Sequence, residues 1–262
     1  MLVYLPEIKS GYNEITNSDT KEQSMLMDIG IQRISKGETL VLSDAKKEMA
    51  LLLLDGKVVF SWQDQSIEAE RTSLFDENPS VLHVPSFTEV SVRAIESSEL
   101  LLQKTDNDKD FSAKFYNKID IRCDIFGENV WEDTARRMVR TVFDYDNAPY
   151  SNMVLGEVIN FPGKWSSYIP HGHDQPEVYF YRFHLDSGFG AGFIGEEVFK
   201  IKNNSALCIP GGPTHPQVAA PGYPMYYAWL IRHLTGNPWT SRNNDERYTW
   251  LLEKDVKIWP SR

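Results

Sequence analysis

The sequence contains few features of a secreted or membrane-bound protein. Its 262 residues include only two cysteines, Cys123 and Cys208, which argues against a disulfide framework. No run of about 18 apolar residues occurs, and the amino-terminal segment contains charged residues instead of a basic and then apolar leader. We therefore expect a cytoplasmic protein that does not bind membranes.

Basic residues are also in the minority. The chain has 27 lysines and arginines against 37 aspartates and glutamates, which gives a formal net charge of −10. A surface of this sign repels the phosphates of nucleic acids, so we do not expect nucleic acid as a partner. The charge is compatible with an anionic small substrate only where arginine or lysine side chains reverse it locally.

Short apolar runs separated by turn residues dominate the chain. In the amino-terminal half, Met49–Leu54 and Val58–Trp62 flank an Asp55-Gly56 pair, a pattern that predicts two strands joined by a hairpin. A charged, turn-rich stretch at 104–118 interrupts the strand pattern, which then begins again. We predict an all-β protein with two domains, 1–110 and 111–262, and short helices only near 131–137 and 245–254.

The most specific pattern in the second half contains three of the six histidines. His171 and His173, two residues apart, would face the same way from one strand. Glu177 opens the next predicted strand and can face both histidines across a hairpin, while His215 follows a later strand that ends in a Pro-Gly turn. Three imidazoles and a carboxylate predict one divalent transition metal, with zinc first and manganese, iron or nickel as alternatives.

The first half lacks this pattern. His83 is its only histidine, and no His-x-His pair precedes it. We predict a structural or solvent-facing position for His83 and a metal-free amino-terminal domain that supplies a wall or a packing surface.

The motifs of the second half resemble the two motifs of the cupin superfamily, His171-x-His173-x-x-x-Glu177 and Pro210-x-Gly212-x-x-His215. The block Trp165-Ser-Ser-Tyr-x-Pro-His-x-His-Asp174, within residues 154–227, is more narrowly similar to the 5-deoxy-glucuronate isomerase family of inositol catabolism. The resemblance implies a bicupin with two jelly-roll-like barrels. It also implies isomerisation of 5-deoxy-glucuronate, a sugar acid, to 2-deoxy-5-keto-gluconate.

This reaction moves hydrogen between a carbonyl carbon and its neighbour, with a metal that polarises the carbonyl and stabilises an enediolate. A base must carry the proton, and we take Glu157, just before the first motif, as the first candidate and Tyr179 as the second. Tyr181 shares the face of Glu177 and is a candidate for binding sugar hydroxyls.

The substrate carboxylate needs a cation nearby. The candidates are Lys164, Arg136 and Arg182, and arginine is favoured for its bidentate geometry. Strand parity turns Arg182 away from the face of Glu177, so it ranks below the other two.

Three other functions fit the same residues. They are isomerisation of another uronate, oxygen-consuming chemistry of a metal-dependent cupin dioxygenase, and sugar binding without turnover. We also expect a homo-oligomer, with Trp62 and Trp131 as candidate contact residues.

Overall fold

The computed structural model describes residues 1–260, and strands make up most of its regular structure. The chain forms two compact units. The amino-terminal unit consists of residues 5–122 and 141–155, and the carboxyl-terminal unit of residues 1–4, 123–140 and 156 onward. The predicted domains, 1–110 and 111–262, differ from this division at residues 1–4, 111–122 and 141–155.

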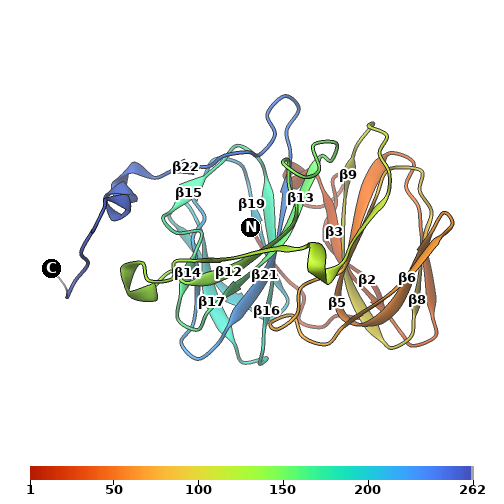
Figure 1. Cartoon of the computed structure of the whole chain (residues 1–262), viewed down its shortest axis with the longest axis horizontal. Helices are drawn as coiled ribbons and strands as arrows, with labels where there is room; N and C mark the ends of the chain where they lie inside the picture. Colours follow the sequence, from red (N-terminus) through yellow and green to blue (C-terminus); the bar gives the residue numbers. More distant parts are fainter. Residues whose placement is uncertain (261–262) are drawn as a thin grey trace. The chain divides into compact units, whose positions relative to one another are not determined.

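The amino-terminal unit is a curled antiparallel sheet, orange to yellow-green in Figure 1. Its order is β10-β7-β5-β9-β3-β2, with β6 and β8 paired to β5 and β4 paired to β8. The strands are β2 (Gly11–Thr16), β3 (Asp28–Ile34), β4 (Thr39–Leu42), β5 (Lys47–Trp62), β6 (Gln65–Arg71), β7 (Val81–Val84), β8 (Val90–Ala94), β9 (Ser98–Asp106) and β10 (Lys114–Tyr116), with 3-10 helices η1 (Gln23–Met25) and η2 (Lys118–Asp120).

The hairpin predicted at Asp55-Gly56 is wrong. Strand β5 runs through this pair without reversing, with an irregularity in its pairing between Leu53 and Asp55. The strand changes partners there, from β7 and β9 to β6 and β8. Gly56 has φ 96°, and a Cβ on it would lie 2.3 Å from Ser98 Oγ. The glycine therefore allows a bend and a close approach inside one strand.

The interior of the amino-terminal unit is apolar. Fully buried side chains from four of its strands pack together in it, among them Leu51, Phe60, Leu82, Val92 and Leu100. Trp62, expected at the surface as an oligomer contact, is only 6% exposed and belongs to this core, so that expectation is wrong for Trp62.

The predicted alternatives for His83 are resolved in favour of a structural position. Its Nε2 lies 2.8 Å from Glu48 Oε2, and its ring stacks on Phe143 with the centroids 4.4 Å apart. Because His83 is fully buried, the ring is part of the packing of this unit.

The carboxyl-terminal unit is built on two larger sheets and one short pair, β15-β22. The orders of the larger sheets are β1-β19-β16-β21-β13-β12-β11 and β14-β20-β17-β18. The strands are β1 (Leu2–Tyr4), β11 (Arg122–Phe126), β12 (Arg137–Phe143), β13 (Met153–Asn160), β14 (Trp165–Ser166), β15 (His171–Gly172), β16 (Glu177–Phe183), β17 (Phe189–Ile194), β18 (Glu197–Lys202), β19 (Ser205–Ile209), β20 (Gln217–Ala219), β21 (Met225–Arg232) and β22 (Asn243–Asn244).

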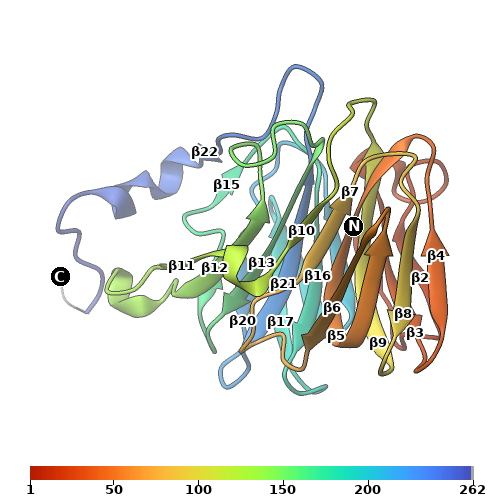
Figure 2. The ribbon, with the colours of Figure 1, turned by 45° about the vertical axis from the view of Figure 1, so that its right-hand side comes forward.

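The two larger sheets of this unit face each other, as Figure 2 shows for β16 and β21 against β17 and β20. Side chains join them: the Tyr181 hydroxyl on β16 donates to Gln217 Oε1 on β20 at 2.6 Å. Ser166 on β14 and Tyr227 on β21 are hydrogen-bonded at 2.8 Å. The interior of this barrel is therefore polar and rich in tyrosine.

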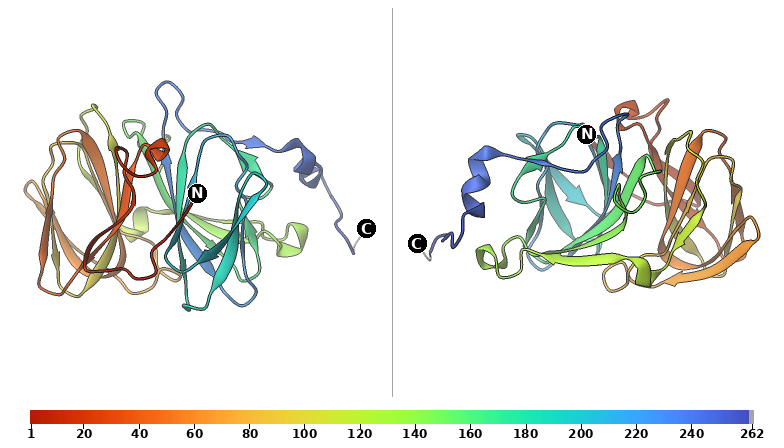
Figure 3. Two further views of the ribbon diagram at one scale, coloured as in Figure 1. Left: turned by 180° about the vertical axis from the view of Figure 1, so that it is seen from behind. Right: turned by 45° about the horizontal axis from the view of Figure 1, so that its top comes forward.

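Helices are few and short, as predicted. The expected helix near 131–137 is reduced to the 3-10 helix η3 (Trp131–Asp133), and the expected terminal helix is the 3-10 helix η4 (Glu246–Leu252), seen at the blue end of the ribbon in Figure 3. Across residues 1–260, none of the helices is both long enough and apolar enough to cross a membrane. The all-β, two-barrel fold class is confirmed.

Candidate metal centre

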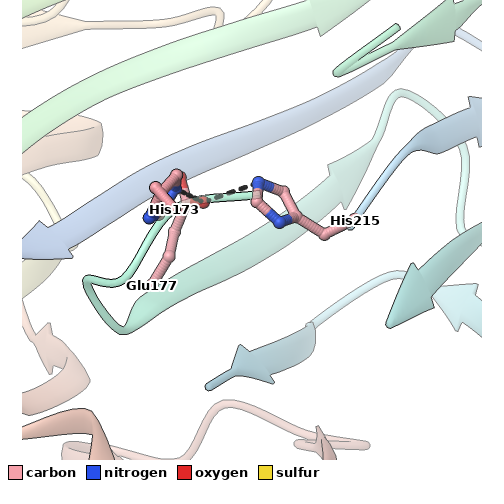
Figure 4. A group of neighbouring side chains, drawn as sticks. All are labelled: His173, Glu177 and His215. Carbon is pink, nitrogen blue, oxygen red and sulfur yellow. Dashed lines mark hydrogen bonds and ion pairs between the residues drawn. The ribbon is translucent and has the colours of Figure 1, made fainter. Parts of the chain in front are cut away.

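Three of the four predicted ligands converge in the carboxyl-terminal unit. Glu177 Oε2 lies 3.2 Å from His173 Nε2 and 3.2 Å from His215 Nε2, as Figure 4 shows. One ligand atom from each of these residues lies within 4.8 Å of the other two, and all three side chains are buried. A carboxylate between two imidazole nitrogens is the arrangement expected around one cation.

The fourth predicted ligand, His171, adjoins this group. Its ring makes an edge contact with that of His215, with centroids 5.4 Å apart, and the residue is buried. The described structure thus places three predicted ligands in one tight cluster and His171 beside it.

The elements that hold the ligands are close in sequence or paired in the sheet. Glu177 is the first residue of β16, as predicted, and lies opposite Ile209, the last residue of β19. The segment after β19 then carries His215 back toward β15, and His215 N donates to His171 O at 3.3 Å. The pairing of β16 with β19 and the backbone contact of His215 with His171 bring the two motifs together. The predicted hairpin before Glu177 is wrong, because β15 pairs with β22 and not with β16.

Glycine in both motifs permits this close approach. Gly212 N donates to His173 O at 2.7 Å. A Cβ on Gly172 would lie 2.3 Å from Gly212 O, and one on Gly211 would lie 1.9 Å from Asp174 O. Because these neighbours are backbone atoms that cannot rotate away, a side chain at either glycine would force the two segments apart.

Backbone carbonyls fix the tautomer of each histidine. The Nδ1 atoms lie 2.8 Å from Ile169 O for His171, 2.9 Å from Gln175 O for His173 and 3.0 Å from Pro213 O for His215. A carbonyl oxygen only accepts, so Nδ1 carries the proton and Nε2 keeps its lone pair. This is the usual arrangement for imidazoles that bind a metal through Nε2.

Burial also favours the neutral form of these rings. It is the largest cause that lowers the pKa of His171 to about 3, followed by the charges of His215 and Arg242. Burial likewise lowers the pKa of His215, against the opposing effect of Glu177. Neutral imidazoles with a free Nε2 and one carboxylate form a donor set that fits a divalent transition metal.

Two predicted tyrosines lie on the face of Glu177. Tyr179 is opposite Trp229 and Tyr181 is opposite Tyr227 in the β16–β21 pairing. The Tyr179 hydroxyl lies 3.3 Å from Ser167 Oγ. Burial raises the pKa of both phenols well above the usual value, so both stay protonated. Tyr179 is therefore suited to donate a hydrogen bond, and its role as a base stays a prediction.

Glu157, the first candidate for the base, lies on the other face of the sheet from the cluster. A Cβ on Gly156 would lie 2.4 Å from the Trp229 ring, so Gly156 faces the interior and the next residue faces away. The fully buried Glu157 accepts a hydrogen bond from the Tyr226 hydroxyl at 2.8 Å and pairs with Arg140 at 3.4 Å. These contacts occupy the other face of the sheet.

Two of the three predicted carboxylate-binding cations have partners outside the cluster. Arg136 pairs with Glu128 at 2.7 Å. Arg182 lies opposite Tyr226 and its guanidinium is over the Phe180 ring, on the outward face that strand parity predicted. The Lys164 side chain makes no hydrogen bond or ion pair within residues 1–260.

Two other arginines near the first histidine motif were not predicted from the sequence. Arg137, next to the predicted Arg136, is buried and donates to Ala135 O and Tyr168 O. Arg242 precedes β22, which pairs with β15. Strand parity along β12 could have separated Arg137 from its neighbour, but no sequence signal marks Arg242, because a pairing between distant segments places it.

Comparisons with known proteins agree on one family. The profile of the KduI/IolB family matches residues 3–251. The 5-deoxy-glucuronate isomerase of Geobacillus thermodenitrificans is 26% identical over 244 residues, which cover 86% of each chain. The protein of the same name from Lacticaseibacillus casei is 26% identical over 227 residues, covering 79% of this chain and 80% of its own.

Solved structures show the same fold. The crystal structure of an IolB-like protein from Salmonella typhimurium LT2 superposes with a TM-score of 0.86 at 18% identity, covering 96% of this chain and 99% of that one. A mutant of Bacillus subtilis oxalate decarboxylase matches with a TM-score of 0.65 at 12% identity, covering 93% of this chain and 79% of that one.

Proposed function

The chain belongs to the KduI/IolB family, and we propose that it is an isomerase that converts 5-deoxy-glucuronate to 2-deoxy-5-keto-gluconate with a divalent metal. The names of its relatives support the reaction. The observation that carries the proposal is the cluster of Glu177 with His173 and His215, whose Nε2 atoms are both directed to the same carboxylate oxygen. Cytoplasmic location and homo-oligomeric assembly remain predictions.

The residues present fit zinc, with His171 completing the set of donors. Three nitrogen donors and one carboxylate suit this ion, and manganese, iron and nickel are the alternatives. When bound, the metal would supply a Lewis acid that polarises the aldehyde and a template for two neighbouring oxygens.

The chain's own groups would orient the sugar. The protonated Tyr179 hydroxyl is available to donate to a substrate oxygen, and its ring is 6.0 Å from that of His215, centroid to centroid. Tyr181 is held by Gln217 and lines the same face. Because these side chains are buried, they would also limit the access of water to the reacting carbons.

The first test combines metal analysis with turnover. Purified protein should contain a near-stoichiometric transition metal and should convert 5-deoxy-glucuronate from an aldehyde to a ketone, followed by proton NMR. His173→Ala removes one nitrogen donor and should lose both the metal and the conversion. His184→Ala is the matched control, because His184 is exposed and lies outside the cluster.

Other outcomes would replace the proposal. Unchanged metal content in His173→Ala would show that the metal site is wrongly assigned. Conversion of a different uronate alone would change the substrate, oxygen uptake without isomerisation would indicate a dioxygenase, and binding without turnover would indicate a sugar-binding protein.

A further inference from the structure

Arg137 is a buried cation with no acidic partner in the described part of the chain. It is 7% exposed, and its guanidinium donates only to neutral oxygens, from Nη1 to Ala135 O at 2.8 Å and from Nη2 to Tyr168 O at 3.4 Å. Arg140 on the same strand, by contrast, pairs with Glu157. Because carbonyls offset only part of the cost of burying a charge, the surroundings of Arg137 are suited to an anion that binds from outside the chain.

Arg242 is a second cation without a partner. It is exposed and forms neither a hydrogen bond nor an ion pair with any other residue within 1–260. Its position is set by the next residue, Asn243, which lies opposite Gly172 in the β15–β22 pairing. Farther along, Asp245 N donates to Pro170 O at 2.9 Å. The backbone that carries Arg242 is therefore fixed beside the first histidine motif, as the positions of β15 and β22 in Figure 1 show.

Both arginines lie along the segment that leads into the first histidine motif. Arg137 Nη2 donates to Tyr168 O at 3.4 Å, and Arg242 precedes Asn243, which lies opposite Gly172. Burial lowers the pKa of Arg137, the Tyr227 phenol opposes this shift, and the charge of Arg242 adds to it. Two like charges without an acid between them repel each other. An anion bound by both would remove this repulsion and would give Arg137 a charged partner.

The arginines lie beside the first histidine motif. Arg137 contacts the backbone at Tyr168, three residues before His171, and the strand that follows Arg242 pairs with His171 and Gly172. The His171 ring is 5.4 Å from that of His215, centroid to centroid. The segment 168–172 therefore connects the two arginines with the histidine cluster.

We propose that Arg137 and Arg242 form an anion subsite that binds the carboxylate of a short sugar acid while the aldehyde end lies at the histidine cluster. The inference rests on the proposed function for the reacting end of the substrate. It adds the residues that select an acid over a neutral sugar. Guanidinium groups suit this task, because their planar fork matches a carboxylate in two parallel hydrogen bonds.

The subsite also gives the segment after β21 a role in binding. Strand β22 contributes only two residues to its pairing with β15. A carboxylate held by Arg242 on this segment and by Arg137 on β12 would connect the segment to the barrel wall. The segment would then be held more firmly when an acid is bound.

The test uses two probes that do not isomerise, D-gluconate and sorbitol, which have equal chain length and differ by a carboxylate. Calorimetry on the metal-loaded protein should show tighter binding of gluconate. Arg242→Gln should weaken gluconate binding about tenfold and leave sorbitol binding unchanged. Arg137→Gln should weaken gluconate binding more, because that side chain is buried. Arg247→Gln is the matched control, since Arg247 is on the same segment and already pairs with Asp245 at 2.7 Å.

Several results would overturn the subsite. They are wild-type protein with no preference for gluconate, Arg242→Gln with an unchanged preference at full metal content, and an equal loss of affinity for both probes. Because neither probe reacts, these results are independent of turnover, which tests the proposed function separately. Arg242 is exposed, so its variant remains informative if Arg137→Gln does not fold.

Discussion

Two buried glutamates of the carboxyl-terminal unit have different partners. Glu177 Oε2 faces the Nε2 atoms of two histidines. Glu157 faces Arg140 and the Tyr226 hydroxyl on the other side of the sheet. The neighbours of a buried carboxylate, more than its burial, determine whether it can take part in chemistry or only in packing.

The role of Glu157 can be tested by Glu157→Gln. The change removes the charge that faces the buried Arg140 guanidinium, so the free energy of unfolding should fall by about 3 kcal/mol. Metal content and kcat should stay as in the wild type, because the side chain is outside the cluster. Urea denaturation and steady-state kinetics check the two parts. Glu177→Gln, in comparison, should lose metal and activity, and a folded, metal-loaded Glu157→Gln without activity would restore Glu157 as the base.

Local spacing predicted the cluster but not the residues around it. Only three residues separate His173 from Glu177, so their spacing in the sequence was sufficient, although the predicted hairpin is replaced by a pairing of β15 with β22. Arg182 was correctly turned outward by strand parity. The face of Glu157 could not be predicted, because it depends on Gly156 packing against Trp229, a contact between distant positions. The position of Arg242 could not be predicted from the sequence for the same reason.

At the scale of elements, two close backbone approaches define the barrels. In one, the segments of the two histidine motifs touch at Gly172 and Gly212. In the other, β5 bends at Gly56 against Ser98. The sequence signal at Gly56 was interpreted as a turn, because an Asp-Gly pair has the same local preference in a hairpin and in a bent strand. Only the pairing with four other strands distinguishes them.

Gly172→Ala should weaken metal binding without removing any ligand. The added methyl would meet Gly212 O at 2.3 Å and Pro213 O at 3.1 Å, so the segments that carry His173 and His215 must separate. We expect metal affinity to fall at least tenfold, measured by competition with a chromophoric chelator, while circular dichroism stays unchanged.

The matched control is Gly222→Ala. Gly222 has φ 84° and a Cβ there meets nothing within 4 Å. This variant should lose about 1 kcal/mol of stability from backbone strain and keep its metal. Equal metal affinity in both variants would show that the close approach at Gly172 is not needed.

At the scale of the whole molecule, the two units bury different kinds of interior. The amino-terminal unit is filled with aliphatic and aromatic side chains. The carboxyl-terminal unit buries four histidines, two glutamates and several tyrosines. Against the net charge of −10, the arginine pair is a local exception, which the proposed acid substrate would require.

Removal of the metal should therefore destabilise the carboxyl-terminal unit and leave the stability of the amino-terminal unit unchanged. A metal present at about 100 times its dissociation constant contributes about 2.7 kcal/mol, which corresponds to a fall of about 5–10 °C in the thermal midpoint after chelation. Hydrogen exchange should increase in β16 and β19, which flank the cluster, and stay constant in β5 and β9. An unchanged midpoint and exchange pattern, with the metal verified as removed, would contradict a stabilising metal.

Strands β12 and β13 each cross the division between the units, after Arg140 and after Leu155. Neither barrel is encoded by one continuous stretch of the gene. A truncation after residue 110 would leave the first barrel without residues 111–122 and 141–155. Exchange of a whole barrel between relatives requires coordinated junctions at residues 4, 122, 140 and 155. Recombination at a single point cannot separate the two halves, so they are expected to be inherited together.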